Sequence, residues 1–285
     1  MLSLSERERR ILELLGENQD ISVSEMSRVL GVSAVTVRND LTSLEGKGLA
    51  VRNHGGATTA YRLGVMERQR TRMREKLAIA REAATFVEDG ESIAIEAGTT
   101  TALVARFLLG KQDVRVISNS LLVLPYMRTN ALVRLTLLGG VFAPTTESLV
   151  GPTAVRDMEQ FRVRYAFVGT DGFDVVSGCT TNIEEGAEIL RTMCRCAEKT
   201  VLLADSSKYG KPGFVKTVPV SEIGLVITDN GLADEDAAAL EAEGPRVLRV
   251  AASGPRDPGS RRSGGRGERG GEQERGGEQE KETLS

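Results

Sequence analysis

Seven short apolar runs, separated by helical stretches, constrain the fold of this chain more than any other feature. Alternation of this kind between residues 92 and 250 is typical of βαβ units, in which crossover helices join parallel strands. We therefore expect an α/β domain with an open, mostly parallel, twisted sheet and helices on both faces. The expected strands are Ser92–Ile95, Arg115–Ser118, Val133–Leu138, Tyr165–Val168, Thr200–Ala204, Gly224–Ile227 and Arg246–Val250.

Small and polar residues follow five of these expected strands. Ligands of an open parallel sheet bind beyond the carboxyl ends of its strands, so we expect these segments to meet at one edge. Together they supply hydroxyls, carboxylates, one amide and one lysine, which match the hydrogen-bonding needs of a polyol phosphate. For any one segment alone, a helix cap is the alternative explanation. The segments are 96–101, 118–120, 139–140, 169–172 and 205–208.

The first fifty residues predict three short helices. Ser5 with Glu8, and Ser22 with Glu25, have the spacing of capping boxes, which mark the first turns of two helices. Gly31 tolerates positive φ and suits the tight turn before a third helix. A short helix, a glycine turn and a longer helix predict a helix-turn-helix. The residues expected to face inward are Ile11, Leu14, Leu15, Met26, Val29, Leu30, Val37, Leu41 and Leu44.

The outer face of the third expected helix carries side chains suited to DNA. Ser33 caps this helix, and both Ser33 and Thr36 are placed to contact phosphates. Arginine can bind guanine through two hydrogen bonds, asparagine can bind adenine in the same way, and an exposed valine suits a thymine methyl. Val35, Arg38 and Asn39 are therefore expected to read base edges in the major groove. For a polar stripe alone, an ordinary solvated helix face is the alternative.

The segment LAVRNHGGATTAY after this helix alternates like a small hairpin, with Gly55-Gly56 as its turn. It favours a wing in which Arg52 and His54 point toward the DNA backbone or the minor groove. At this point GVSAVTVRNDLTSLEGKGLAVRNHGGA resembles the N-terminal signature of the DeoR-type repressors of sugar metabolism. One residue departs from the usual family pattern, because Asn39 replaces the second of two arginines.

The segments that follow the expected strands resemble the effector domain of the same family, and through it the ribose-phosphate isomerase and CoA-transferase type of fold. With the N-terminal signature, the resemblance covers roughly residues 5 to 250. It implies that 98–101 hold a phosphate, that Asn119 and the 139–140 turn line the pocket, and that Asp171 and Lys208 meet the sugar. The implied effector-binding residues are Gly98, Thr99, Thr100, Thr101, Asn119, Gly139, Gly140, Asp171 and Lys208. Glu96, Ser118 and Leu190 depart from the usual pattern.

We therefore expect a bacterial transcriptional repressor whose affinity for double-stranded operator DNA depends on a small phosphorylated sugar. An alternative is a sugar-phosphate isomerase or transferase fused to a DNA-binding module, with Asp171, Asp174, Glu184, Glu185 and Lys208 as candidate acids, bases and electrophile. A third reading is a scaffold whose helix-turn-helix contacts proteins.

His54 is the single histidine and lies in the N-terminal module, so the larger region has no imidazole for a nucleophilic pair. We expect no catalytic residues, no cofactor and no metal, since the three cysteines lack zinc-site spacing.

The composition changes along the chain predict four parts. Residues 1–60 form the winged helix-turn-helix, 61–76 a basic linker with six Lys and Arg against two Glu, 77–251 the effector-sensing domain, and 252–285 a disordered Gly/Arg/Glu-rich tail. No run of eighteen apolar residues and no signal peptide occur, so we expect a cytoplasmic protein without membrane contact. Paired DNA half-sites favour a homodimer or a higher oligomer.

Overall fold

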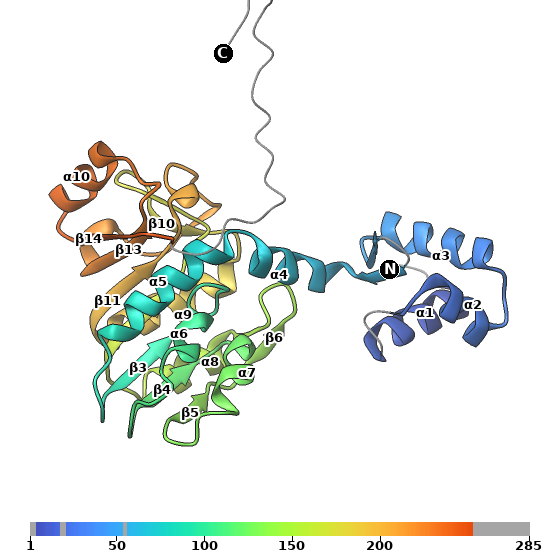
Figure 1. Ribbon diagram of the computed structural model, residues 1–285, viewed down its shortest axis with the longest axis horizontal. Helices are drawn as coiled ribbons and strands as arrows, with labels where there is room; N and C mark the ends of the chain where they lie inside the picture. Colours follow the sequence, from blue (N-terminus) through green and yellow to red (C-terminus); the bar gives the residue numbers. More distant parts are fainter. Residues whose placement is uncertain (1–3, 18–20, 54–55, 253–285) are drawn as a thin grey trace, which may run out of the picture. The chain divides into compact units, whose positions relative to one another are not determined.

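The computed structural model describes residues 4–17, 21–53 and 56–252, which Figure 1 colours from blue to red. The prediction of a disordered tail therefore falls outside the described residues, apart from Ala252. The N-terminal part has three helices and one antiparallel hairpin. These elements are α1 (Glu6–Glu17), α2 (Val23–Leu30), α3 (Ala34–Gly46), β1 (Ala50–Asn53) and β2 (Gly56–Thr59).

Both predicted capping boxes form. The Ser5 amide donates to Glu8 Oε2 at 2.7 Å, and the Glu8 amide donates to Ser5 Oγ at 3.1 Å. Ser22 and Glu25 make the same reciprocal pair at 2.9 and 3.1 Å. Gly31 ends α2 with φ 65°, in the left-handed conformation that glycine adopts without strain. The sequence thus specifies where the first two helices begin and where the turn follows.

The inward face of the helix-turn-helix agrees with prediction except at Val29, whose side chain is 50% exposed. The buried stripe of α2 runs through Val23 and Met26, and Leu30 packs against it. Val29 lies about 100° around the helix from Leu30, which turns it to the edge of that stripe.

In the hairpin, Asn53 pairs with Gly56, so Gly56 belongs to the second strand. The other predicted turn glycine, Gly55, lies outside the described residues.

All seven predicted strands lie in one sheet, in the order β14-β13-β11-β8-β3-β4-β5. Every neighbouring pair in this sheet is parallel. The fold prediction, an N-terminal helix-turn-helix followed by an open parallel α/β domain, is therefore confirmed. The strands are β3 (Ser92–Ile95), β4 (Arg115–Ser118), β5 (Arg134–Leu137), β8 (Val163–Val168), β11 (Ala197–Leu203), β13 (Leu225–Asp229) and β14 (Arg246–Val250).

Helices cover both faces of this sheet (Figure 1). Along β3, Ile93 and Ile95 pack in the core that includes α5 and α6, whereas Ala94 packs in the core that includes α8, α9 and α10. Alternation of this kind follows from the two-residue repeat of a strand. The helices of the domain are α5 (Met73–Thr85), α6 (Ala102–Arg106), α7 (Leu124–Met127), α8 (Pro152–Met158), α9 (Glu184–Arg195) and α10 (Asp234–Ala242).

The sequence did not reveal several smaller elements. The predicted basic linker contains α4 (Ala60–Arg70) and the start of α5. Two small antiparallel sheets follow the ends of the main strands: the hairpin of β6 (Val141–Ala143) and β7 (Ser148–Val150), and a sheet of β9 (Gly172–Asp174), β10 (Gly178–Thr181) and β12 (Val215–Lys216). In the part of the chain that the structure describes, no helix is both long enough and apolar enough to cross a membrane.

Candidate functional site

A cavity of about 420 Å³ opens beyond the carboxyl ends of β3, β4, β8 and β11. Residues 96–101, 169–171, 203–205, 207 and 208 line it together with Asn119, and the wall also includes residues of α4, α5 and α9. Seven of the nine predicted effector-binding residues therefore come together here. These seven are Gly98, Thr99, Thr100, Thr101, Asn119, Asp171 and Lys208.

Gly139 and Gly140, the other two predicted residues, are not among those that line the cavity. The Gly139 amide donates to Asp157 Oδ2 at 2.7 Å. Gly140 has φ 138°, and a Cβ on it would lie 2.6 Å from the Val150 carbonyl oxygen. The structure thus places the two glycines where the backbone turns from β5 into β6 and packs closely on its neighbours, and not beside the other seven residues.

The loop between β3 and α6 is held by Thr101. Its hydroxyl donates to the carbonyl oxygens of Glu96 at 2.6 Å and Gly98 at 3.1 Å, and its side chain is fully buried. A Cβ on Gly98 would lie 2.8 Å from Thr101 Oγ1, so the close turn suits glycine. Thr101 therefore shapes the loop, whereas the half-buried Thr99 offers its hydroxyl toward Lys76.

Lys76 is a cavity residue that the sequence reasoning missed, because it was assigned to the linker. Lys76 is 5% exposed, and burial lowers the pKa of its amine to about 8. The amine donates to Thr99 Oγ1 at 3.1 Å and to the Arg68 carbonyl oxygen. The available signal was its spacing, since Lys76 shares one helix face with the buried Ile79 and Ala83.

Glu96 lines the same cavity and is 7% exposed. Its Oε2 atom accepts a hydrogen bond from the Gly169 amide at 3.1 Å. Burial, with a smaller contribution from the nearby Asp171, raises the pKa of the Glu96 carboxyl to about 8. A carboxyl of this kind holds its proton at neutral pH, so it can donate a hydrogen bond into the cavity.

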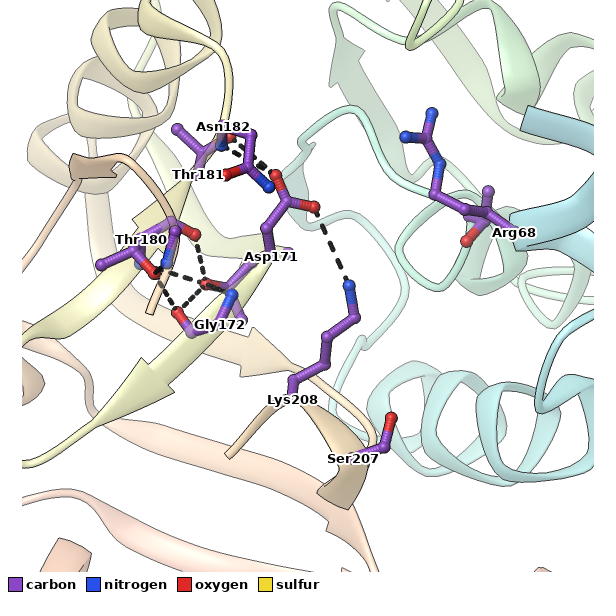
Figure 2. Close-up of polar contacts among 12 residues, drawn as sticks. Arg68, Asp171, Gly172, Thr180, Thr181, Asn182, Ser207 and Lys208 are labelled. Carbon is purple, nitrogen blue, oxygen red and sulfur yellow. Dashed lines mark hydrogen bonds and ion pairs between the residues drawn. The ribbon is translucent and has the colours of Figure 1, made fainter. Parts of the chain in front are cut away.

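Asp171 and Lys208 face each other across the end of β8 (Figure 2). Asp171 Oδ2 accepts from the Asn182 amide at 2.9 Å and from Thr181 Oγ1 at 3.2 Å, which fixes the carboxylate. The Lys208 amine lies 3.8 Å from Asp171 Oδ1, and both side chains are 31% exposed. Figure 2 shows Lys208 reaching from the loop after β11 toward this carboxylate, so a charged donor and a charged acceptor stand together on the wall.

Asn119 contributes the most unusual polar atom of the cavity. The residue is 1% exposed, and its Nδ2 atom donates to the Leu149 carbonyl oxygen at 3.2 Å. Its Oδ1 atom is buried and has no hydrogen-bond partner among the described residues. A buried acceptor without a partner is costly, so this atom is one that the described residues leave unsatisfied.

The predicted DNA-binding residues that the structure describes lie at the N-cap of α3, along α3 and in β1. Val35 is 63% exposed, and Arg38 and Asn39 are exposed on the same helix. Ser33 Oγ accepts from the Thr36 amide at 3.1 Å, which caps α3 as predicted. The backbone of Arg52 lies in β1, but its side chain, and the whole of His54, lie outside the described residues.

The cysteines give no sign of a reactive or metal-binding centre. Burial raises the pKa values of the Cys179 and Cys194 thiols to about 12, which keeps them protonated. Within residues 4–17, 21–53 and 56–252, no group of three or more His, Cys, Asp or Glu side chains is arranged to hold a metal ion.

Comparison with known proteins gives two family matches. The DeoR-like helix-turn-helix domain matches residues 7–62, and the DeoR C terminal sensor domain matches residues 71–230. The chain is similar to the HTH-type transcriptional regulator GlpR of Haloferax volcanii, with 36% identity over 249 residues that cover 86% of this chain and 97% of that protein. It is 29% identical over 252 residues to a putative aga operon transcriptional repressor of Escherichia coli O157:H7, which covers 86% and 94% of the two chains. A solved ribose 5-phosphate isomerase of Methanocaldococcus jannaschii is similar over 48% of this chain and 54% of that chain, with 23% identity and a TM-score of 0.34.

Proposed function

Because the chain belongs to the DeoR family of DNA-binding transcriptional regulators, we propose that a phosphorylated sugar binds in the cavity of its sensor domain and changes its affinity for operator DNA. We further propose that the chain represses genes of carbohydrate metabolism. The cavity binds this effector without converting it, in keeping with relatives that are named as transcriptional regulators.

The observation that carries this proposal is the unsatisfied chemistry of the cavity wall. Among the described residues, no carboxylate lies within ion-pair distance of the buried Lys76 amine, and Asn119 Oδ1 has no donor. A sugar phosphate meets both needs, because its phosphate pairs with an amine and its hydroxyls donate to an amide oxygen. Lys208 and Asp171 supply a further donor and acceptor for other hydroxyls.

The size of the cavity also suits a small ligand. Its volume of about 420 Å³ falls in the lower part of the range that is usual for small-molecule sites, roughly 300 to 1,000 Å³. A single sugar phosphate is of this size. The wall combines small residues at 98–101 with amines on opposite segments, an arrangement that fixes the orientation of an anionic ligand.

On the DNA side, we propose that α3 enters the major groove and that the hairpin contacts the backbone or minor groove. The proposed contact residues are Ser33, Val35, Thr36, Arg38, Asn39, Arg52 and His54. Two half-sites require at least a dimer of the chain. We propose a DNA-binding part at 1–60, a connector from residue 61, a sensor domain that ends near 251 and a tail at 252–285; the family matches to 7–62 and 71–230 support the first and third parts, and the second match begins within the predicted linker 61–76.

The effector acts by differential affinity. A ligand that shifts a repressed population fully, from 1:99 to 99:1, must favour one conformation by roughly 5 kcal/mol, and partial release of repression needs less. By thermodynamic reciprocity, operator DNA must change the affinity for the effector by the same factor. The proposal therefore predicts coupling that can be measured from either ligand.

The test uses the purified full-length chain. Its melting temperature is measured with ribose 5-phosphate, fructose 1-phosphate, fructose 6-phosphate and glycerol 3-phosphate, and with ribose, fructose and glycerol as matched controls. We expect at least one phosphorylated compound to raise the melting temperature, and Lys208→Ala and Asn119→Ala to reduce that rise. The same compound should change the affinity for DNA taken from upstream of the gene in gel-shift titrations.

Three outcomes would contradict the proposal. Shifts equal to those of the unphosphorylated controls would remove the phosphate assignment. Turnover of a sugar phosphate that Lys208→Ala abolishes would favour the isomerase or transferase alternative. DNA affinity that does not fall with salt would favour the scaffold alternative, because phosphate neutralisation makes log K fall linearly with log salt.

A further inference from the structure

Asn39 lies near the centre of the exposed face of α3. Val37, Leu41 and Leu44 are 0% exposed and define the inward direction of this helix. Each residue advances an α-helix by about 100°, so Asn39 lies roughly 170° from the mean direction of these three side chains. Val35 precedes it by one turn on the same outer face. An object that meets α3 from outside therefore meets both Val35 and Asn39.

Neighbouring polar residues fix the rotation of α3 about its own axis. Asp40 accepts two hydrogen bonds from the Arg7 guanidinium of α1, at 2.5 and 3.0 Å. The Ser43 hydroxyl donates to Glu8 Oε1 at 2.7 Å, and the Lys47 amine lies 2.6 Å from the same atom. Because these contacts tie α3 to α1, its rotation about its own axis is fixed, and the neighbouring exposed face that carries Asn39 is presented in one orientation.

Two polar side chains on α3 are free of such contacts. Among the described residues, neither the Arg38 guanidinium nor the Asn39 amide has a hydrogen-bond or ion-pair partner. An asparagine amide presents a donor and an acceptor side by side. This pair matches the acceptor and donor that adenine shows in the major groove, whereas an arginine matches the two acceptors of guanine.

We propose that Asn39 determines one base of each operator half-site by recognising an adenine, beside a different base that Arg38 reads. This inference rests on the proposed function, because it requires α3 to enter the major groove. It goes further in assigning a base to one side chain. The acceptor and donor must both be present, so a residue with only one of them, or with neither, loses the preference.

The test is selection of binding sequences from a library of random duplex DNA by the full-length chain. Wild type, Asn39→Ala, Asn39→Asp and Asn39→Arg are compared at one salt concentration. We expect the wild-type motif to contain one position per half-site where adenine exceeds every other base by about tenfold. Asn39→Ala and Asn39→Asp should flatten that position alone, and Asn39→Arg should replace adenine by guanine there.

Three measurements separate base recognition by Asn39 from folding and from base recognition by Arg38. Asn230→Ala removes another exposed amide, in the sheet domain, and should leave the whole motif unchanged. Asn39→Ala should keep the melting temperature of the wild type, because alanine favours an exposed helical position. Arg38→Ala should flatten a position different from the one that Asn39 controls.

The outcomes distinguish this inference from the proposed function. A wild-type motif that Asn39→Ala leaves intact, or one without an adenine that depends on Asn39, overturns the inference and leaves the regulator in place. Salt-sensitive binding that enriches no motif at all overturns both, because such a chain reads no base. A single position that changes from adenine to guanine with Asn39→Arg supports both.

Discussion

The Arg72 guanidinium lies with its Nε atom 2.9 Å from Asp205 Oδ1, on a carboxylate that is 4% exposed. Its Nη2 atom also lies 3.1 Å from Asp229 Oδ2, and Arg72 itself stands between α4 and α5 with φ 52°. Asp205 begins the segment that carries Lys208 to the cavity wall. Arg72 thus ties the junction of two helices to a segment that lines the cavity.

Loss of the Arg72 side chain should destabilise the sensor domain. Arg72→Ala leaves two nearly buried carboxylates, Asp205 and Asp229, without their cation. Because Arg72 is 31% exposed, we expect the free energy of unfolding to fall by roughly 2 to 4 kcal/mol, somewhat below the cost of breaking a fully buried pair. Urea unfolding followed by circular dichroism measures this change.

Two further variants separate the effect of the buried ion pair from backbone strain and from the loss of an exposed arginine. Arg72→Gly removes the same side chain but also relieves the left-handed strain, so it should be less destabilising than Arg72→Ala by about 1 kcal/mol. Arg164 is 54% exposed and pairs with Glu91 and Glu198, so Arg164→Ala should cost less than Arg72→Ala, roughly 1 kcal/mol or less. Equal stability of Arg72→Ala and Arg164→Ala would show that the buried carboxylates do not depend on Arg72.

The helix-turn-helix should lose stability in acid through Glu8. Hydrogen bonds from Lys47, Ser43 and the Ser5 amide lower the pKa of this carboxyl to about 2. A carboxyl with a depressed folded pKa stabilises the fold above its unfolded pKa, and this contribution disappears as the pH falls toward the folded pKa. We therefore expect stability to fall between about pH 4.5 and pH 2.

Glu8→Gln is the matched variant for this effect, because it keeps the shape and removes the titration. Its stability should be lower than that of the wild type at pH 6 and should approach it at pH 2. Hydrogen-exchange rates of the backbone amides in α1 and α3, measured at several pH values, would report this difference in stability in the full chain. A constant difference between the two proteins over that range would contradict the assignment to Glu8.

The sequence predicts best where local chemistry decides the structure. Ser22 with Glu25 specifies a helix start, and the apolar runs specify all seven strands of the main sheet, because each depends on residues close in sequence. The family matches also confirm the resemblance seen in the sequence. Lys76 was missed because it was assigned to the linker, although its spacing from Ile79 and Ala83 places it on the face of α5 that packs against the sheet.

The role of a glycine that follows a strand is ambiguous from the sequence for a related reason. Gly98 and Gly140 both follow a strand closely, and both fit the pattern expected at the ligand edge of a sheet. Only the position of the next segment distinguishes them: Gly98 turns toward α6 and lines the cavity, whereas Gly140 turns into a hairpin against Val150. Because β6 and β7 are only three residues long and β6 is largely exposed, the sequence does not signal that hairpin.

Gly140 should accordingly matter for folding. Gly140→Ala forces a side chain into φ 138° with its Cβ 2.6 Å from the Val150 carbonyl oxygen, which we expect to cost about 2 to 4 kcal/mol. Gly210→Ala is a control, since Gly210 also has positive φ but a Cβ there meets no atom within 4 Å. Urea unfolding of the two variants should show the larger loss for Gly140→Ala, and equal losses would argue against the close contact.

Glu96 should make the stability of the sensor domain fall as the pH rises. Its folded pKa of about 8 exceeds the ordinary value of 4.5, so the folded chain keeps a proton that the unfolded chain loses. A raised carboxyl pKa gives stability that is complete below about pH 4.5 and decreases until the pH passes the folded pKa. Glu96→Gln carries no titrating group, so its advantage over the wild type should grow from pH 5 to pH 8.

Melting temperatures of the two proteins at half-unit pH steps measure this difference. Lys76 does not obscure the effect of Glu96. Burial lowers the pKa of the Lys76 amine from 10.5 to about 8, so the titration of Lys76 changes stability only between about pH 8 and pH 10.5. The two groups act in opposite directions: stability falls with pH through Glu96 and then rises with pH through Lys76. A difference between Glu96→Gln and wild type that stays constant from pH 5 to pH 8 would mean that the Glu96 carboxyl is ionised in the folded chain, which removes it as a hydrogen-bond donor to the proposed effector.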